Sequence, residues 1–294
     1  MRYVIGIDGG GTSCRAALAD RQGRILGCAS RGPANIRTDL VGAFENIEAA
    51  VAEAADQAGV ATRELRQAVA VLGLAGSNAG DYPARLLARL DFRDSLIVND
   101  GLVALHGALG AHDGVVGIVG TGSVFLGRAQ GAVRTIGGWG FEVGDLGGGA
   151  RLGRRLLEDC LLAYDGAGPA SALTRRVFAC FEGDPAVLVE AVRGAAPEFY
   201  GKFVPRLCEA AGEGDPVANA ILDAGCRDVE RMFDALMAPD TARLCLLGGL
   251  APVYAPRLRA AYRARLTAPL GDALAGAIAL ALCRADALER LEGD

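Results

Sequence analysis

Two glycine-rich turns, each set between apolar runs, constrain this chain more than any other feature. The first is Gly-Gly-Gly-Thr at residues 9–12, and the second is Gly-Thr-Gly-Ser at residues 120–123. The apolar residues on both sides of each turn favour strands, so each pattern predicts a hairpin. A glycine has no Cβ atom, which lets the backbone N–H groups of such a turn approach an anion. Two phosphate-binding hairpins, or two ordinary tight turns, would explain the pattern.

The side chains beside these turns favour phosphate binding. Hydroxyl groups stand at Thr12, Thr121 and Ser123, and Asp8 places a carboxylate before the first turn. A Walker-type phosphate loop is excluded because it needs a lysine after its glycines, and the only lysine, Lys202, follows no glycine-rich loop. A dinucleotide-binding fold is disfavoured because the first turn leads into a second strand and not into a helix.

Composition and charge narrow the class of partner and the compartment. The formal charge of −5 and the isoelectric point near 5.2 argue against a surface for nucleic acid or an anionic membrane. The N-terminus has no signal-peptide pattern, and the longest apolar helix candidate, residues 273–283, is too short to span a bilayer. Eight cysteines without a Cys-x-x-Cys pair predict buried free thiols in a reducing cytoplasm. Only two histidines are present, which gives a serine triad or a zinc hydrolase little support.

The order of the apolar runs predicts an α/β fold in two similar halves. Strands are expected at residues 3–7, 16–19, 25–29, 69–75 and 95–98, with a helix over 44–58 whose apolar residues recur at helical spacing. A second strand group is expected over 115–141, then helices, one beginning at Asp215-Pro216, and a late strand over 243–247. The Pro- and Gly-rich stretch 183–205 is expected to connect helices over the surface. The two turns suggest two α/β domains that face one another across a cleft.

Asp100 is the main candidate for a catalytic base. It follows the apolar run 96–98, and the carboxyl ends of parallel strands in an open α/β sheet face the ligand crevice. Phosphoryl transfer to an alcohol needs a carboxylate that orients the hydroxyl group and accepts its proton. The alternative is that Asp100 only caps the helix expected from Leu102, and the two roles are compatible. Asp8 also ends a strand, where it suits a water-mediated contact to Mg²⁺.

The stretch from Gly137 to Gly149 predicts a loop that approaches a ligand. It contains the only tryptophan of the chain, Trp139, among several glycines, and a carboxylate at Asp145. An aromatic ring can cover the apolar face of a sugar, and a carboxylate can accept hydrogen bonds from its hydroxyl groups. A neutral polyol is therefore the expected ligand. A flexible glycine loop with a core tryptophan is the alternative.

Taken in order, these motifs resemble those of a known superfamily. They are residues 6–12, Asn99-Asp100, residues 120–123, Gly-Gly-Trp-Gly at 137–140 with Gly144-Asp145, and Leu-Gly-Gly at 247–249. They look like the phosphate, connecting and adenosine motifs of the actin-like sugar kinases, and the likeness spans nearly the whole chain. More narrowly, the chain resembles the bacterial glucosamine and N-acetylglucosamine kinases of the BadF/BadG/BcrA/BcrD ATPase family. Short matches at residues 34–36 and 214–216 favour the glucosamine kinases.

The resemblance implies two ribonuclease-H-like, actin-like ATPase domains with a nucleotide and sugar cleft between them. The N-terminal domain is expected at residues 1–112 plus 273–294, because the last helix returns to it, and the C-terminal domain at 113–272. ATP and Mg²⁺ are the implied cofactors, and Asp100 is the implied base for the 6-hydroxyl of an amino sugar. The implied ATP contacts are Gly9, Gly10, Gly11, Thr12, Thr121, Gly122, Gly248 and Gly249. The implied sugar contacts are Asn35, Ser77, Asp100, Gly138, Trp139 and Asp145, with Asp8 as the metal residue.

One departure from the family pattern leaves the sugar open. Many relatives have an acidic residue or glutamine, then Gly-Ser, after the Gly-Asp pair, whereas this chain has Leu146-Gly147-Gly148. D-glucosamine is the expected substrate and N-acetylglucosamine the alternative, in a cytoplasmic enzyme for which a homodimer is compatible with the resemblance. A further alternative is an ATPase activator with an iron–sulfur cluster, for which Cys160 and Cys180 are the candidate thiolates. A non-catalytic sugar sensor is a third interpretation.

Overall fold

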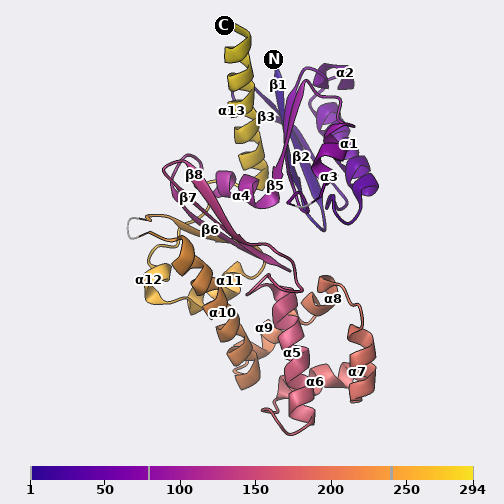
Figure 1. The fold of residues 1–294 in the computed structure, drawn as a ribbon, viewed down its shortest axis with the longest axis vertical. Coiled ribbons are helices and arrows are strands. Elements are labelled where there is room, and N and C mark those ends of the chain that lie inside the picture. Colours follow the sequence, from indigo (N-terminus) through magenta and orange to yellow (C-terminus); the bar gives the residue numbers. More distant parts are fainter. Residues whose placement is uncertain (1, 79, 239–240, 294) are drawn as a thin grey trace. The chain divides into compact units, whose positions relative to one another are not determined.

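The chain forms two compact units, shown as a ribbon in Figure 1. The computed structural model describes residues 2–78, 80–238 and 241–293. Unit 1 comprises Met1–His112 and Ala268–Asp294, and unit 2 comprises Asp113–Thr267. The second boundary therefore lies at 267/268 and not at the expected 272/273. The reason is that the intervening segment is bonded to unit 1, where the backbone N–H of Leu270 donates to the carbonyl of Ala108 at 3.0 Å.

Unit 1 is built on a five-stranded mixed sheet in the order β3-β2-β1-β4-β5. β1 pairs antiparallel with β2, and β2 with β3, whereas β1, β4 and β5 run parallel. Every residue of β4 is buried, as expected for a central strand covered on both faces. All five predicted strands of this half are confirmed, as β1 (Tyr3–Gly9), β2 (Cys14–Asp20), β3 (Ile25–Arg31), β4 (Val69–Leu74) and β5 (Asp94–Asn99).

Helices cover both faces of this sheet. On one face, Ile5, Ile7 and Leu72 share a core with Ile47 of α1. On the other face, Val4, Val69 and Val71 share a core with α4 and α13, and Figure 1 shows α13 and α1 on opposite sides of the strands. The expected return of the last helix to the N-terminal half is thus confirmed. The helices of unit 1 are α1 (Leu40–Gln57), α2 (Thr62–Leu65), α3 (Tyr82–Leu87), α4 (Asp100–Leu109) and α13 (Ala273–Gly293).

Two glycines let α4 and α13 cross with their backbones in contact. A Cβ atom placed on Gly107 of α4 would lie 1.9 Å from the carbonyl oxygen of Asp272. A Cβ atom on Gly276 of α13 would lie 1.9 Å from the carbonyl oxygen of Val103. Because no side chain fits in this space, the crossing requires glycine at both positions. The position of α4, and with it of its first residue, depends on this contact.

Unit 2 contains a four-stranded sheet in the order β8-β7-β6-β9. β6, β7 and β8 form an antiparallel meander, and β9 runs parallel to β6. The strands are β6 (Gly114–Val119), β7 (Ser123–Ala129), β8 (Ala132–Gly137) and β9 (Leu244–Leu247). The strand group ends at Gly137 and not near residue 141, because the glycines that follow adopt positive φ angles that a strand does not allow.

Helices make up the rest of unit 2. α10 begins where the sequence predicts it, because Asp215 accepts hydrogen bonds from the N–H groups of Val217 at 3.0 Å and Ala218 at 3.1 Å. The prediction of a surface connection over 183–205 is wrong, since Pro185 and Pro197 each stand in the first turn of a helix. These helices are α5 (Gly149–Tyr164), α6 (Ala172–Phe178), α7 (Pro185–Val192), α8 (Pro197–Gly201), α9 (Val204–Gly212), α10 (Pro216–Leu236), α11 (Ala251–Tyr254) and α12 (Ala260–Arg263), with single 3₁₀ turns at Ala179–Phe181 and Ala255–Arg257.

The cysteines differ in part from the expectation that they are buried. All eight are free thiols, and Cys14, Cys160, Cys226 and Cys245 are buried. Cys28, Cys180 and Cys283 are exposed, and Cys208 is half-buried. Over residues 2–78, 80–238 and 241–293, no helix combines the length and apolar character that crossing a bilayer requires.

Candidate active site

Asp100 stands where the central sheet of unit 1 ends and α4 begins. Asn99 is the N-cap of this helix, and its side chain accepts a hydrogen bond from the N–H of Gly101 at 2.9 Å. The alternative that Asp100 is the helix cap is therefore wrong, because Asp100 is the first residue inside the helix. Its own Oδ1 also accepts from the N–H of Gly101 at 2.9 Å. The helix start holds this carboxylate at the carboxyl ends of β4 and β5.

The surroundings of Asp100 make its carboxylate a stronger base than an exposed one. Burial raises the pKa of Asp100, the hydrogen bond from the N–H of Gly101 lowers it, and the negative charge of Asp8 raises it. The net effect is a raised pKa. A carboxylate with a raised pKa accepts a proton more readily, which is what a general base for an alcohol requires.

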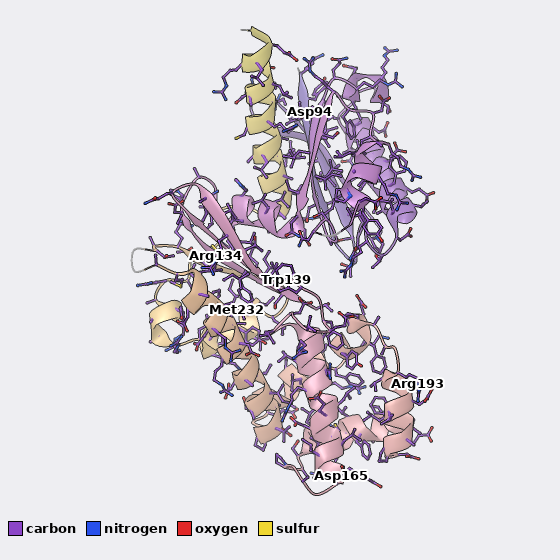
Figure 2. All side chains as sticks on the ribbon, viewed as in Figure 1. Asp94, Arg134, Trp139, Asp165, Arg193 and Met232 are labelled. Atoms are coloured by element: carbon purple, nitrogen blue, oxygen red, sulfur yellow. The ribbon has the colours of Figure 1, made fainter. Side chains whose placement is uncertain are left out.

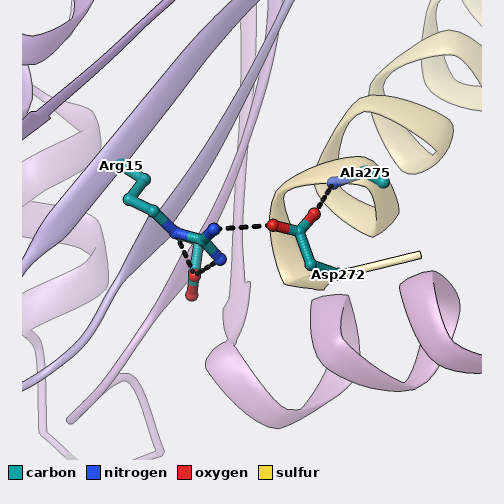
Figure 3. Close-up of polar contacts among 4 residues, drawn as sticks. Arg15, Asp272 and Ala275 are labelled. Atoms are coloured by element: carbon teal, nitrogen blue, oxygen red, sulfur yellow. Dashed lines mark hydrogen bonds and ion pairs between the residues drawn. The ribbon is translucent and has the colours of Figure 1, made fainter. Parts of the chain in front are cut away.

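Arg15 connects Asp8 to the start of α13, and Figure 3 shows Arg15 in contact with Asp272. Asp8 and Arg15 are register partners across the β1–β2 hairpin, and the Arg15 Nη2 lies 2.7 Å from Asp8 Oδ2. The Arg15 Nη1 lies 2.6 Å from Asp272 Oδ2, and Asp272 in turn accepts from the N–H of Ala275 at 3.0 Å. Arg15 was missed at the level of sequence, although its place opposite Asp8 across the turn is a signal that strand pairing could have given.

The donor set around Asp8 fits a hydrated metal ion. Within the described part of the chain, no group of three or more His, Cys, Asp or Glu side chains could hold a bare ion. One carboxylate that is already paired with Arg15 supplies a single ligand group. Mg²⁺ keeps several of its waters in such sites, so Asp8 fits a contact to the ion through water.

The first glycine turn combines structural and open positions. The N–H of Gly10 donates to the carbonyl of Ser13 at 2.8 Å, which closes the turn. A Cβ atom on Gly9 would lie 2.6 Å from Leu74 Cδ2, so this glycine makes room for the neighbouring strand. A Cβ atom on Gly11 would meet nothing within 4 Å, and Thr12 is exposed. The open part of the turn is therefore Gly10 to Thr12.

Asn35 and Ser77 lie on neighbouring loops of unit 1. Asn35 Oδ1 accepts from the N–H of Arg37 at 3.1 Å, and a Cβ atom on Gly76 would lie 2.5 Å from the same oxygen. Gly76 has a φ of 81°, which glycine adopts without strain. Among the described residues, the hydroxyl oxygen of Ser77 is buried without a hydrogen-bond partner. A buried hydroxyl of this kind is suited to a ligand that supplies the missing bond.

The second glycine turn is tied to the loop that follows β8. Ser123 Oγ donates to the carbonyl of Leu146 at 2.7 Å, and the N–H of Gly138 donates to the carbonyl of Ser123 at 2.9 Å. The N–H of Gly149 donates to the carbonyl of Gly120 at 2.8 Å. Turn 120–123 and loop 138–149 therefore form one hydrogen-bonded assembly, with Thr121 exposed at its edge.

Asp145 and Trp139 differ in exposure, although both belong to loop 138–149. Asp145 Oδ2 lies 2.5 Å from the place that a Cβ atom on Gly122 would take, so its carboxylate lies against the second glycine turn. Trp139 is 74% exposed, and Figure 2 labels it on the loop after β8. The alternative of a core tryptophan is therefore wrong, and the indole ring is accessible to a ligand.

Gly248 and Gly249 lie at the same edge of the sheet of unit 2 as turn 120–123. Gly248 has a φ of 91°, and a Cβ atom on it would lie 2.4 Å from the carbonyl oxygen of Val119. The N–H of Leu250 donates to that carbonyl at 3.0 Å. A Cβ atom on Gly249 would meet nothing within 4 Å. Unit 2 thus brings Thr121, Gly122, Gly138, Asp145 and Gly248 together, whereas Asp8, Gly10, Asn35, Ser77 and Asp100 belong to unit 1.

Tyr254 holds loop 138–149 in place through a buried hydrogen bond. Its side chain is fully buried, and its hydroxyl group donates to the carbonyl of Gly147 at 2.6 Å. We expect Tyr254→Phe to lower the free energy of unfolding by about 1–3 kcal/mol, because a buried carbonyl loses its donor. Denaturant unfolding measures this loss, and Tyr164→Phe, at a side chain that is 58% exposed, is the control. Equal losses in the two variants would contradict an anchoring role for the Tyr254 hydroxyl.

Comparison with known proteins places these features in one family. Residues 5–257 match the BadF/BadG/BcrA/BcrD ATPase family. The chain is 33% identical over 282 residues to the glucosamine kinase of Vibrio cholerae, covering 96% of each protein. The crystal structure of a candidate N-acetylglucosamine kinase from Chromobacterium violaceum superposes with a TM-score of 0.87 at 31% identity, covering 96% of this chain and 99% of that one.

A more distant structure supports the fold alone. It is a ROK family glucokinase from Streptomyces griseus, solved with glucose and AMPPNP, with a TM-score of 0.57 at 18% identity, covering 95% of this chain and 98% of that one. The expected fold class, α/β with two actin-like ATPase units, is confirmed by these likenesses. The match over residues 5–257 and the full-length relative show that this chain belongs to the BadF/BadG/BcrA/BcrD ATPase family.

Proposed function

We propose that this protein is an ATP-dependent kinase that phosphorylates the 6-hydroxyl of an amino sugar, with D-glucosamine as the main substrate. The observation that carries the proposal is Asp100, a carboxylate with a raised pKa at the carboxyl ends of parallel strands. Support comes from the glucosamine kinase of Vibrio cholerae, which aligns with 96% of this chain. The products are glucosamine 6-phosphate and ADP.

The reaction assigns a role to each group of residues. Asp100 accepts the proton of the 6-hydroxyl. The oxygen of this hydroxyl forms a bond to the γ-phosphorus, and the bond between the γ-phosphorus and the oxygen that bridges it to the β-phosphate breaks. Gly11 and Thr12 present backbone N–H groups and a hydroxyl group to the phosphates, at a turn that the Gly10 N–H closes by donating to the carbonyl of Ser13. Asp8 would hold Mg²⁺ through water, and the ion would supply positive charge to neutralise the phosphates. Asn35 and the Ser77 hydroxyl bind hydroxyl groups of the sugar.

The residues of unit 2 have roles of their own in the proposed reaction. Thr121 and Gly122 bind the ATP phosphates, and Gly248 and Gly249 flank the adenosine. Trp139, which is 74% exposed, covers the apolar face of the sugar ring. Gly138 and Asp145 complete the sugar contacts. Because ATP is the phosphoryl donor, the cytoplasm remains the predicted location, and a homodimer remains compatible with the proposal.

Two alternatives differ in chemistry. N-acetylglucosamine carries a neutral amide at C2 where glucosamine carries an ammonium group, and Leu146 leaves the choice open because it replaces a polar residue of many relatives. An iron–sulfur ATPase activator is less well supported, because burial raises the pKa of Cys160 to about 12 and keeps the thiol protonated. The other candidate, Cys180, accepts a hydrogen bond from Arg206 Nη1 at 2.9 Å, so its sulfur already has a partner within this chain.

A sugar screen tests the proposal. A coupled assay of ADP release with glucosamine, N-acetylglucosamine, glucose and N-acetylmannosamine should give the highest kcat/KM for glucosamine. The matched control is 6-deoxyglucosamine, which keeps the amino group but lacks the acceptor hydroxyl and should give no sugar-dependent ADP. Sugar-independent ADP release with every compound, or phosphorylation of the 6-deoxy sugar, would contradict the proposal.

A further inference from the structure

Asp145 lies against the second glycine turn, residues 120–123, a contact that its predicted place in the sugar site does not explain. We propose that its carboxylate contacts turn 120–123 when no sugar is bound, and so weakens ATP binding. A sugar that binds Asp145 then moves the carboxylate off the turn. Asp145 is then a positioning residue that makes productive ATP binding depend on the acceptor. The inference rests on the proposed function and deepens it.

The contacts of Asp145 carry this inference. A Cβ atom on Gly122 would lie 2.5 Å from Asp145 Oδ2 and 3.0 Å from its Cγ. The space left open by Gly122, expected to admit a phosphate, is therefore filled by a carboxylate. The Asp145 Oδ1 accepts from the N–H of Gly140 at 3.3 Å, and the backbone N–H of Ser123 also bonds to this carboxylate. The side chain of Asp145 thus accepts hydrogen bonds from both turn 120–123 and loop 138–149.

A carboxylate in this place competes with a phosphate. The backbone N–H groups of a glycine turn attract anions in general, and the carboxylate of Asp145 takes up the donor at Ser123. A second negative charge within a few ångströms of the turn also repels the γ-phosphate. While Asp145 lies on Gly122, the turn is a poor phosphate site.

The local backbone allows Asp145 to leave. Asp145 has a φ of 52°, in the left-handed region that Asp tolerates better than most residues, so the present position is held by its contacts. Gly138 and Gly140 of the same loop have φ of 70° and 94°, and because glycine also adopts negative φ, these two positions set no steric limit on a rearrangement. The bond to the N–H of Gly140 is long at 3.3 Å. Hydroxyl groups of a sugar are donors that can replace these N–H groups at the carboxylate.

The consequence is a preferred order of binding. A sugar that engages Asp145 removes a negative charge from the turn and frees the N–H of Ser123. ATP then binds to the turn more tightly when an acceptor is in place, which limits the transfer of the phosphoryl group to water. By thermodynamic linkage, the nucleotide must strengthen sugar binding by the same factor.

Nucleotide affinity without sugar is the decisive measurement. We expect Asp145→Asn, which keeps the shape and the left-handed backbone but removes the charge, to bind Mg²⁺-AMPPNP about tenfold more tightly than the unchanged protein, within the usual range of such couplings. Saturating glucosamine should raise the affinity of the unchanged protein about tenfold and that of the variant little. Titration calorimetry gives both Kd values. Asp145→Gly, which tolerates the positive φ, is a second variant with the same expected sign.

Glu142→Gln is the matched control, because Glu142 is an exposed carboxylate on the same loop and should leave the nucleotide Kd unchanged. Equal or weaker sugar-free affinity in both Asp145 variants, with their fold shown intact by circular dichroism, would overturn the inference. The sugar-free comparison needs no kinase activity. Tighter nucleotide binding by the variants in a protein that phosphorylates no sugar would therefore overturn the proposed function and not the effect of Asp145 on the turn.

Discussion

Asp100→Asn is expected to lower kcat for sugar phosphorylation by about 100- to 10,000-fold, the usual contribution of a general base. The amide keeps the size of the side chain but cannot accept the proton of the 6-hydroxyl. The Kd for Mg²⁺-AMPPNP should change by less than about threefold, because the loss is confined to the chemical step. Single-turnover kinetics and calorimetry measure the two quantities separately.

The control for this variant is Asp94→Asn, a carboxylate at the opposite end of β5 that pairs with Arg284. It should leave kcat largely unchanged, so a loss at Asp100 alone cannot come from a general disturbance of the strand. Turnover close to that of the unchanged protein in Asp100→Asn would remove Asp100 from the role of base. A large loss of nucleotide affinity would instead assign it to phosphate or metal binding.

The dependence on pH follows from the raised pKa of Asp100. The base must be ionised to work, so activity falls as the pH drops through this pKa, at a higher pH than for an ordinary aspartate. The contribution of Asp100 to the free energy of unfolding changes with pH in the opposite direction. A carboxyl group with a raised pKa in the folded state contributes stability below its unfolded pKa and loses it as the pH rises. Asp100→Asn should therefore be at least as stable as the unchanged protein near neutral pH, as urea unfolding can show.

The sequence was sufficient to predict the elements that depend on local pattern. Strand β4 is a continuous apolar run, and Asp215-Pro216 is a cap followed by proline, so both were predicted within a few residues of their observed positions. Helices α7 and α8 were missed because glycines and prolines nearby were interpreted as a connection. Their prolines stand in the first helical turn, where the missing N–H has no cost.

The candidate site was predictable as a set of residues but not as a set of contacts. Asp100 and the two turns were found from strand ends and glycines, which are local features. The contact between Arg15 and Asp272 joins positions far apart in the chain, and no local pattern reports it. The carboxylate of Asp145 on Gly122 likewise depends on how loop 138–149 folds back on the turn. Such contacts follow from tertiary packing, which periodicity does not encode.

The crossing of α4 and α13 gives the second prediction. We expect Gly276→Ala to lower the free energy of unfolding of unit 1 by about 2–3 kcal/mol, the cost of an added methyl group in a tightly packed place. The added Cβ atom would lie 1.9 Å from the carbonyl oxygen of Val103 and 2.5 Å from the N of Gly107. Both neighbours are backbone atoms, so the helices themselves must move apart. Hydrogen exchange measured by mass spectrometry should show the loss of protection in α4 and α13.

Gly212→Ala is the matched control, because Gly212 is an exposed glycine at the end of α9 where a Cβ atom would meet nothing within 4 Å. Alanine favours helices over glycine by about 1 kcal/mol, so this variant should be slightly more stable and the two changes should differ in sign. A shift of α4 also moves Asp100, its first residue, so Gly276→Ala should lower kcat as well. A variant as stable and active as the unchanged protein would show that the crossing adapts without moving the base. The same substitution thus tests whether the packing of the last helix holds Asp100 in position.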